Sequence, residues 1–344
     1  MSETTHALYR THRPQSFAAV KNQPHIVSVL EGALKKKAIP HALLFIGSRG
    51  TGKTTVARIF AREAGAADID IYEIDAASNR GIDDIRELRE SVLALPYESP
   101  YKVYIIDEVH MLSKEAFNAL LKTLEEPPAH VLFILATTER DKVPDTVISR
   151  CQVLEFHAPS REELRAVIEE VAKKEKYALT PAAADVVALA ANGSYRDALG
   201  ILQKVMLASA DAKLTPDEVA AVVGAPKQAI LADVMEAFAT HNIEKGLGAL
   251  KAAHDAHVDV KLLYRLLLER VRAVIVVRNL KAHATNAFAA FSEEEQTVLA
   301  GYGADPASPI NSHLLKRLLG AGEYIGRSAV PELPLELVLL EHTV

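Results

Sequence analysis

The chain has 344 residues, 49% of them hydrophobic and 6% aromatic, with no tryptophan, so we expect two or three largely helical units rather than a β-sandwich. Its 39 basic and 45 acidic residues nearly balance in both halves, which excludes a nucleic-acid module that binds through bulk positive charge. The single cysteine, Cys151, excludes an internal disulfide and any multi-cysteine metal site.

The first residues, MSETTHALYRTHRPQ, lack the apolar core of a signal peptide. No apolar run approaches the ~20 residues that a membrane-spanning helix needs. We therefore expect a soluble protein of the reducing cytoplasm.

Five apolar, β-favouring runs alternate with helical stretches up to Phe156. They are residues 41–47, 68–75, 101–107, 130–138 and 151–156. This alternation predicts βαβ units on a parallel, five-stranded sheet, an α/β domain that ends near residue 158.

After Pro159 we expect the strands to stop and the apolar spacing to become helical. Helix starts are indicated at Ser160, at Thr180 and at Thr215. The segment VVGAP, residues 222–226, marks a second boundary. We therefore predict three domains, an α/β domain at 1–158, a helical lid at 159–223 and a helical C-terminal domain at 224–344.

A phosphate-binding loop follows the first strand. The sequence GSRGTGKT satisfies G-x-x-x-x-G-K-[ST] between a strand and a helix, the context that the motif requires. Backbone amides of such a loop surround phosphate oxygens, while Lys53 supplies positive charge and Thr54 a hydroxyl for Mg²⁺. The predicted nucleotide-binding residues here are Gly47, Ser48, Arg49, Gly50, Thr51, Gly52, Lys53, Thr54 and Thr55.

The third predicted strand ends in Asp107 and Glu108. Asp107 can hold Mg²⁺ and Glu108 can polarise an attacking water, which would make the site a hydrolase. A solvated strand end is the alternative. The fourth strand ends in Thr137 and Thr138, whose hydroxyls are placed to sense a γ-phosphate at the carboxyl edge of the sheet, or else cap a turn. Of the two we favour Thr138.

Arg150 precedes the fifth strand, where its guanidinium could reach the phosphates of a neighbouring subunit. Such an arginine finger can be worth ~10³ to 10⁵ in rate. For an isolated arginine, a surface salt bridge is the more ordinary role.

These motifs together closely resemble one family. The segments LYRTHRPQSF, GSRGTGKTT, EIDAASNRGIDDIRELRE, YKVYIIDEVHMLSKEAFNALLKTLEEPP, ILATTE, ISRC and GSYRDAL are similar to those of the gamma/tau subunits of bacterial DNA polymerase III, which are clamp loader ATPases of the AAA+ class. The resemblance spans Leu8 to Leu199. The remainder is similar only in being helical and of fitting length, as an oligomerising collar would be.

The resemblance implies a role for several residues. Arg13 and Pro14 would lie at the adenine and ribose of ATP, and Thr138 would be the first sensor. Arg150 would act on the ATP of an adjacent subunit. Arg196, in the lid, would be the second sensor and would close the lid on bound ATP.

The resemblance also implies partners. They are other clamp loader subunits, a sliding clamp and primed-template DNA, with ATP and Mg²⁺ as cofactors. Candidate DNA contacts are Asn79, Arg80 and Arg86, although the acidic neighbours of Arg86 are equally typical of a solvated helix face.

Two departures from the family are apparent. Members usually carry a four-cysteine zinc module before the second strand, whereas here AREAGAADIDIYEID passes directly from helix to strand, so we predict no zinc site. The longer family form also extends past the collar, so this sequence represents either a short form or part of a longer chain.

Two other functions remain open at this stage. One is an AAA+ branch-migration or remodelling motor, against which the all-helical end after Pro226 argues. The other is a scaffold that binds ATP without hydrolysis, against which Glu108 and Arg150 argue. Nothing in the sequence resembles a polymerase site.

Overall fold

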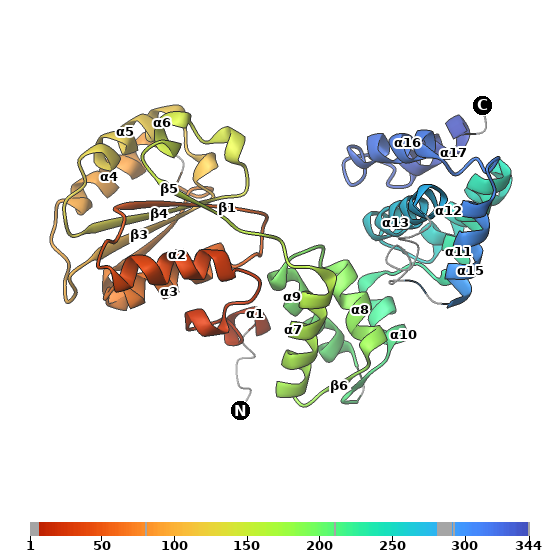
Figure 1. The fold of residues 1–344 in the computed structure, drawn as a ribbon, viewed down its shortest axis with the longest axis horizontal. Helices are drawn as coiled ribbons and strands as arrows, with labels where there is room; N and C mark the ends of the chain where they lie inside the picture. Colours follow the sequence, from red (N-terminus) through yellow and green to blue (C-terminus); the bar gives the residue numbers. More distant parts are fainter. Residues whose placement is uncertain (1–6, 80, 210, 281–290, 292, 343–344) are drawn as a thin grey trace. The chain divides into compact units, whose positions relative to one another are not determined.

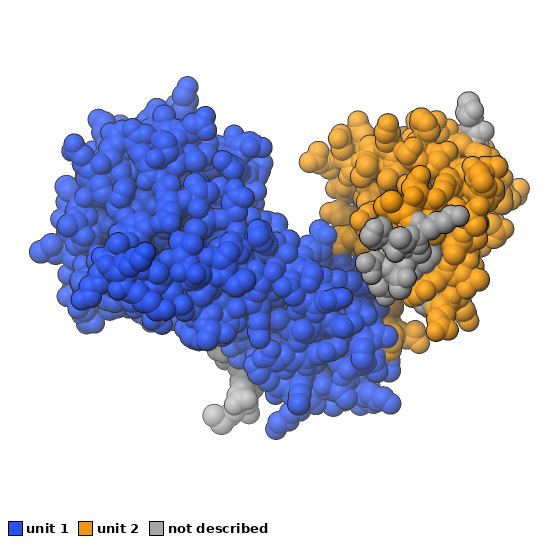
Figure 2. Space-filling view, in the orientation of Figure 1, with its two compact units in different colours: residues 1–215 blue, residues 216–344 orange. Residues whose placement is uncertain are grey.

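The computed structural model describes residues 7–79, 81–209, 211–280, 291 and 293–342. The chain forms two compact units, residues 1–215 and residues 216–344, shown in blue and orange in Figure 2. The first unit contains both the α/β part and the helices expected to form the lid. The division into three domains stays a prediction.

The α/β part is built on a five-stranded parallel sheet, as the sequence predicts. The spatial order of the strands is β2-β3-β4-β1-β5. The strands are β1 (Ala42–Ile46), β2 (Ile71–Asp75), β3 (Lys102–Asp107), β4 (Val131–Thr137) and β5 (Gln152–Glu155). All five lie within the runs expected from the sequence.

The central strands are apolar without interruption because both faces of the sheet are covered. Along β1, for example, Leu44 packs on one face of the sheet with Tyr104 and Phe133. Its neighbour Leu43 belongs to the core on the other face. Figure 1 shows α2 and α3 on one face of the sheet and α4, α5 and α6 on the other. Since all the strands run parallel, their carboxyl ends meet at one edge.

Two helices of the first unit begin at their expected start signals. Ser160 and Thr180 are the N-caps of α7 and α8, and each side chain accepts a hydrogen bond from a backbone amide of the first turn. The helices are α1 (Leu8–Thr11), α2 (Pro24–Lys35), α3 (Lys53–Glu63), α4 (Ile82–Val92), α5 (Lys114–Glu125), α6 (Asp145–Ile148), α7 (Arg161–Lys174), α8 (Pro181–Ala190) and α9 (Tyr195–Ala208).

The expectation that strands stop after Pro159 was wrong in one detail. Two short strands, β6 (Ala178–Leu179) and β7 (Lys213–Leu214), pair in parallel outside the main sheet. Each has only two residues, so neither produces the alternating pattern by which a strand is recognised in a sequence.

The second unit is helical over its described residues and packs around its own apolar core. The helix α13 contributes Leu263, Leu267, Val271 and Val274 to that core. The helices are α10 (Pro216–Val223), α11 (Gln228–Thr240), α12 (Ile243–Asp255), α13 (Val260–Asn279), α15 (Glu293–Ala304), α16 (Ser312–Gly322) and α17 (Leu333–His342).

In the described ranges of both units, no helix combines the length and the apolar character that crossing a bilayer requires.

Candidate nucleotide site

The phosphate loop connects β1 to α3, and its conformation explains its glycines. Gly50 and Gly52 have φ angles of +75° and +104°, in the region that residues with a side chain rarely adopt. The ammonium group of Lys53 donates hydrogen bonds to the backbone oxygens of Gly47 (2.7 Å) and Ser48 (3.0 Å). The lysine thus lies inside the curve of the loop, where a bound phosphate would need its charge.

Lys53 is 6% exposed, and burial lowers its pKa. The carboxylates of Glu108 and Asp107 raise the pKa in opposition, and Arg196 lowers it further. The structure therefore brings four of the predicted site residues, from the phosphate loop, the end of β3 and the lid, within electrostatic range of one another.

Thr54 and Asp107 form the candidate magnesium site. The Thr54 hydroxyl, at the start of α3, donates to Asp107 Oδ2 across 2.9 Å. Hydroxyl and carboxylate oxygens are ligands that Mg²⁺ accepts, and it usually takes only one or two carboxylates together with phosphates. The residues present therefore fit a magnesium ion that accompanies a nucleotide.

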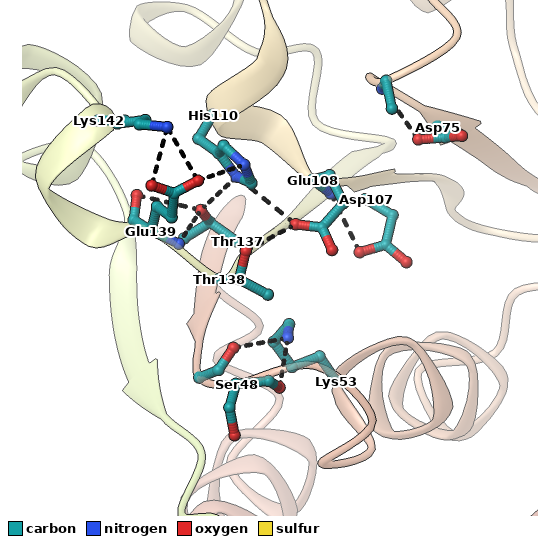
Figure 3. Close-up of polar contacts among 12 residues, drawn as sticks. Ser48, Lys53, Asp75, Asp107, Glu108, His110, Thr137, Thr138, Glu139 and Lys142 are labelled. Atoms are coloured by element: carbon teal, nitrogen blue, oxygen red, sulfur yellow. Dashed lines mark hydrogen bonds and ion pairs between the residues drawn. The ribbon is translucent and has the colours of Figure 1, made fainter. Parts of the chain in front are cut away.

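Glu108 lies directly beyond the end of β3 and has a φ angle of +51°. This conformation is uncommon for a residue with a side chain and is found preferentially at functional sites. The backbone amide of Glu108 donates to Asp107 Oδ1 (3.1 Å), and its carboxylate accepts a hydrogen bond from Thr138 (3.2 Å). Figure 3 shows Asp107, Glu108 and Thr138 above Ser48 and Lys53 of the phosphate loop.

The structure adds His110, which the sequence interpretation did not assign. Its imidazole is 6% exposed, with Nε2 3.2 Å from Glu139 and Nδ1 3.0 Å from Thr137 and 3.5 Å from Glu108 (Figure 3). The ring therefore lies within reach of two carboxylates and one hydroxyl. The only sequence signal was its position two residues after Glu108, and the short 3₁₀ turn Val109–Met111 that folds the ring back over the sheet was not predictable from it.

The helix α9, in the segment predicted to form the lid, contacts the phosphate loop directly. The backbone amide of Tyr195, in the first turn of α9, donates to the oxygen of Gly50 (3.0 Å). A Cβ atom added at Gly50 would lie 2.0 Å from the hydroxyl oxygen of Ser194, the N-cap of α9. Arg196 follows in the same turn of α9, and its guanidinium is near enough to Lys53 to lower the pKa of that lysine.

The N-terminal segment also reaches the site. The Nε of Arg13 donates to the hydroxyl of Thr55 on α3 (2.9 Å). Burial lowers the pKa of Arg13, and the nearby guanidinium of Arg58 lowers it further. The guanidinium of Arg196 lies 5.9 Å from the ring centre of Tyr9. The segment therefore touches both the helix after the phosphate loop and the lid, and the partly buried Pro14 follows Arg13 directly.

Other predicted residues of the loop have simpler roles in the structure. Thr51 is buried and its hydroxyl donates to the oxygen of Ser48 (2.9 Å), which closes the loop. Arg49 is exposed.

Arg150 is not brought to the site within one chain. It donates to Glu125 (2.6 Å) and to the backbone oxygen of Thr146 (2.7 Å) on the surface. The candidate DNA contacts are likewise not part of this group of site residues. Asn79 donates to the backbone oxygen of Asp75, Arg86 pairs with Asp83, and Arg80 lies outside the described residues.

Across the described ranges, no three His, Cys, Asp or Glu side chains are grouped so that they could hold a metal ion. The absence of a zinc site stays a prediction.

Comparison with known proteins identifies the family of this chain. A family profile described as "DNA polymerase III, delta subunit" matches residues 63–160. The tau subunit of DNA polymerase III from Bacillus subtilis is 41% identical over 71% of this chain and 47% of its own length. The gamma subunit from Buchnera aphidicola is 32% identical over 79% of each chain. The chain thus spans about half of the Bacillus relative and most of the Buchnera one.

Among solved structures, the Thermotoga maritima RuvB Holliday junction branch migration motor superimposes with a TM-score of 0.53. It is 21% identical and covers 66% of this chain and 79% of its own. This similarity supports the AAA+ type of fold and carries no statement of activity. The relatives above decide the family, and the chain belongs to the gamma/tau subunits of bacterial DNA polymerase III.

Proposed function

We propose that this chain is the ATPase subunit of a bacterial clamp loader, which uses ATP binding and hydrolysis between subunits to open a sliding clamp and place it on primed DNA. One observation carries the enzymatic part. The hydrogen bond from Thr54 to Asp107 places the end of the phosphate loop against the acidic end of β3, beside Glu108. A magnesium nucleotide and an activating carboxylate are the groups that such a junction assembles.

Each predicted residue has a part in this proposal. Lys53 and the loop amides hold the phosphates, and Thr54 and Asp107 hold Mg²⁺, which neutralises phosphate charge. Glu108 orients and polarises the attacking water, and Thr138 senses the γ-phosphate. Arg196 couples the nucleotide to the lid. Arg13 and Pro14 contact the adenosine.

The partners follow from the family. Other clamp loader subunits would bind through the helical C-terminal unit, and the clamp and primed-template DNA would bind the assembled loader in the cytoplasm. DNA would be tracked by phosphate contacts rather than by base reading. Asn79, Arg80 and Arg86 are the proposed contacts.

The decisive experiment measures ATP turnover by the chain assembled with its cognate partner subunits, with and without sliding clamp and primed DNA. We expect strong stimulation only when both are present. Turnover that ignores the clamp but rises with branched or duplex DNA would instead support the branch-migration or remodelling motor. The absence of turnover under every condition would support the scaffold that binds ATP without hydrolysis.

Two variants separate binding from hydrolysis. Glu108→Gln should keep ATP binding and lose roughly 10² to 10⁴ of the turnover, because the water loses its activating carboxylate. Lys53→Ala should lose both binding and turnover. Unchanged turnover in Glu108→Gln would remove Glu108 from the mechanism.

A further inference from the structure

The second unit contains a cavity of about 370 Å³ that is unrelated to the nucleotide site. It lies among the end of α11, the end of α13, the loop at residues 306–311, the start of α16 and the end of α17. Its volume is in the range of small-molecule sites. Nothing in the family assignment or the proposed function uses it.

The lining of this cavity is cationic. Among the described residues, two arginines and three histidines line it, and no aspartate or glutamate does. The five residues are His241, Arg278, His313, Arg317 and His342. Two guanidiniums carry charge at every physiological pH, so the cavity is positive without a carboxylate in its wall to neutralise it.

The pKa of His342, which lines this cavity, is lowered. Burial lowers its pKa, and His241 and Arg317 lower it further, against a hydrogen bond to the backbone oxygen of Phe238 that raises it. Because that oxygen can only accept, the proton lies on Nε2 of the ring (3.1 Å). Burial and the neighbouring positive groups therefore both favour the neutral form of this ring.

The donors of the cavity are incompletely used. Arg278 donates to the backbone oxygens of Tyr302 (2.9 Å) and Ser308 (3.4 Å), but its buried Nε has no hydrogen-bond partner among the described residues. Buried donors without partners are costly, and a ligand that accepts hydrogen bonds is one way to satisfy them.

A metal ion is the first alternative for a site with three histidines. The described residues contain no group of three potential ligands with suitable spacing, and cationic guanidiniums would repel a metal. The ligand that suits guanidinium and imidazole donors is an oxyanion, held through charge-assisted hydrogen bonds.

We propose that this cavity binds a small, multiply charged phosphate anion. Arg278 and Arg317 neutralise it from two elements, α13 and α16, and His241 and His313 add donors. The cavity holds more than a single phosphate, which favours a di- or triphosphate group. The start of α16 adds the positive end of a helix dipole to the same wall.

The test uses the full chain and metal-free inorganic pyrophosphate as the probe, measured by titration calorimetry. The phosphate loop would also bind this probe, so all variants carry Lys53→Ala. His313 and Arg317 are both exposed and one turn apart on α16. Changing both to Gln removes the charge of one wall, and the thermal unfolding curve checks that the unit still folds. The matched control is Lys316→Gln, an exposed neighbour that does not line the cavity.

We expect the Lys53→Ala chain to bind pyrophosphate, with at least a tenfold loss in the His313→Gln/Arg317→Gln variant and no change in the Lys316→Gln control. Equal binding in all three, an equal loss in the control, or no binding at all would overturn the proposal. A single-stranded oligonucleotide is titrated in parallel. If the double variant weakens only oligonucleotide binding, the wall contacts a nucleic-acid backbone and the small-anion site is wrong.

Discussion

The carboxylate of Glu108 accepts a hydrogen bond from the hydroxyl of Thr138, with 3.2 Å between Oε2 and Oγ1. The two residues follow neighbouring strands, β3 and β4, at the carboxyl edge of the sheet. If the Thr138 hydroxyl contacts a phosphate oxygen instead when ATP is bound, as we propose, it would link the state of the nucleotide to the position of the proposed water activator.

This contact makes Thr138 testable by substitution. Thr138→Ala should lower ATP turnover roughly 10- to 100-fold, because a displaced carboxylate activates water poorly, while ATP affinity changes little. Thr138→Ser keeps the hydroxyl and should retain most of the turnover. Steady-state kinetics of the assembled loader and nucleotide titration measure the two quantities. A serine variant as slow as the alanine variant would show that the methyl group, and not the hydroxyl, matters.

His110 should act on Glu108 by position. His110→Ala removes the ring that lies between the carboxylates of Glu108 and Glu139, so we expect turnover to fall about tenfold with nucleotide affinity preserved. His110→Asn returns a hydrogen-bonding group near the place of Nδ1 and should recover part of the rate. The pH–rate profile distinguishes positioning from simple destabilisation, because only the former changes the profile of Glu108-dependent turnover. Equal thermal stability with an unchanged rate would contradict this role.

Gly50 should be intolerant of a side chain because of the lid. Gly50→Ala would combine a φ of +75° with a Cβ placed 2.0 Å from the oxygen of Ser194. Gly52→Ala is the matched control, since φ is +104° there but no atom of the described residues lies within 4 Å of the added Cβ. We expect the control to cost about 1–3 kcal/mol in free energy of unfolding from backbone strain, and Gly50→Ala about 1–3 kcal/mol more. Denaturant unfolding without nucleotide measures both, and equal losses would mean that the lid moves aside freely.

Much of the candidate site was predictable because its residues lie within one continuous motif or at the end of a recognisable strand. The phosphate loop is continuous, and Asp107 and Glu108 end a strand that is buried on both faces, so motif and pattern located them. The contacts that cross the fold were not predictable. His110 reaches Glu139 and Ser194 reaches Gly50 only after the sheet and the lid have assembled, and no spacing in the sequence encodes either approach.

An acid-sensitive contact lies at Asp70, which is fully buried at the end of the short 3₁₀ helix just before β2. Burial raises its pKa, but the Ser99 hydroxyl and the backbone amides of Glu98, Tyr97 and Ser99 outweigh this and lower the pKa to about 2. The folded pKa lies below the unfolded one. The stabilisation is therefore complete above the unfolded value near 4 and is lost as pH falls towards 2.

Asp70→Asn should accordingly lower the melting temperature at pH 7 by about 5 °C, because charge-assisted hydrogen bonds are lost. The difference between wild type and variant should shrink as the pH falls from 4 towards 2. Thermal unfolding followed by circular dichroism at pH 7, 4 and 3 measures it. Asp68→Asn, two residues earlier and exposed, is the control and should change little. A difference that stays constant with pH would show that the carboxylate is not the stabilising species.

Arg150 offers a test of action between subunits, since the partners described for it lie on the surface of its own chain. Its ion pair with Glu125 is exposed, and such pairs contribute about 0–1 kcal/mol, so the guanidinium can leave it at little cost. Arg150→Ala should lower turnover of the assembled loader by roughly 10³-fold or more and leave ATP affinity of the isolated chain unchanged. Glu125→Gln breaks the same ion pair but keeps the guanidinium, so turnover should be preserved. If both variants lose turnover equally, the salt bridge itself supports the structure and the arginine finger must be sought elsewhere.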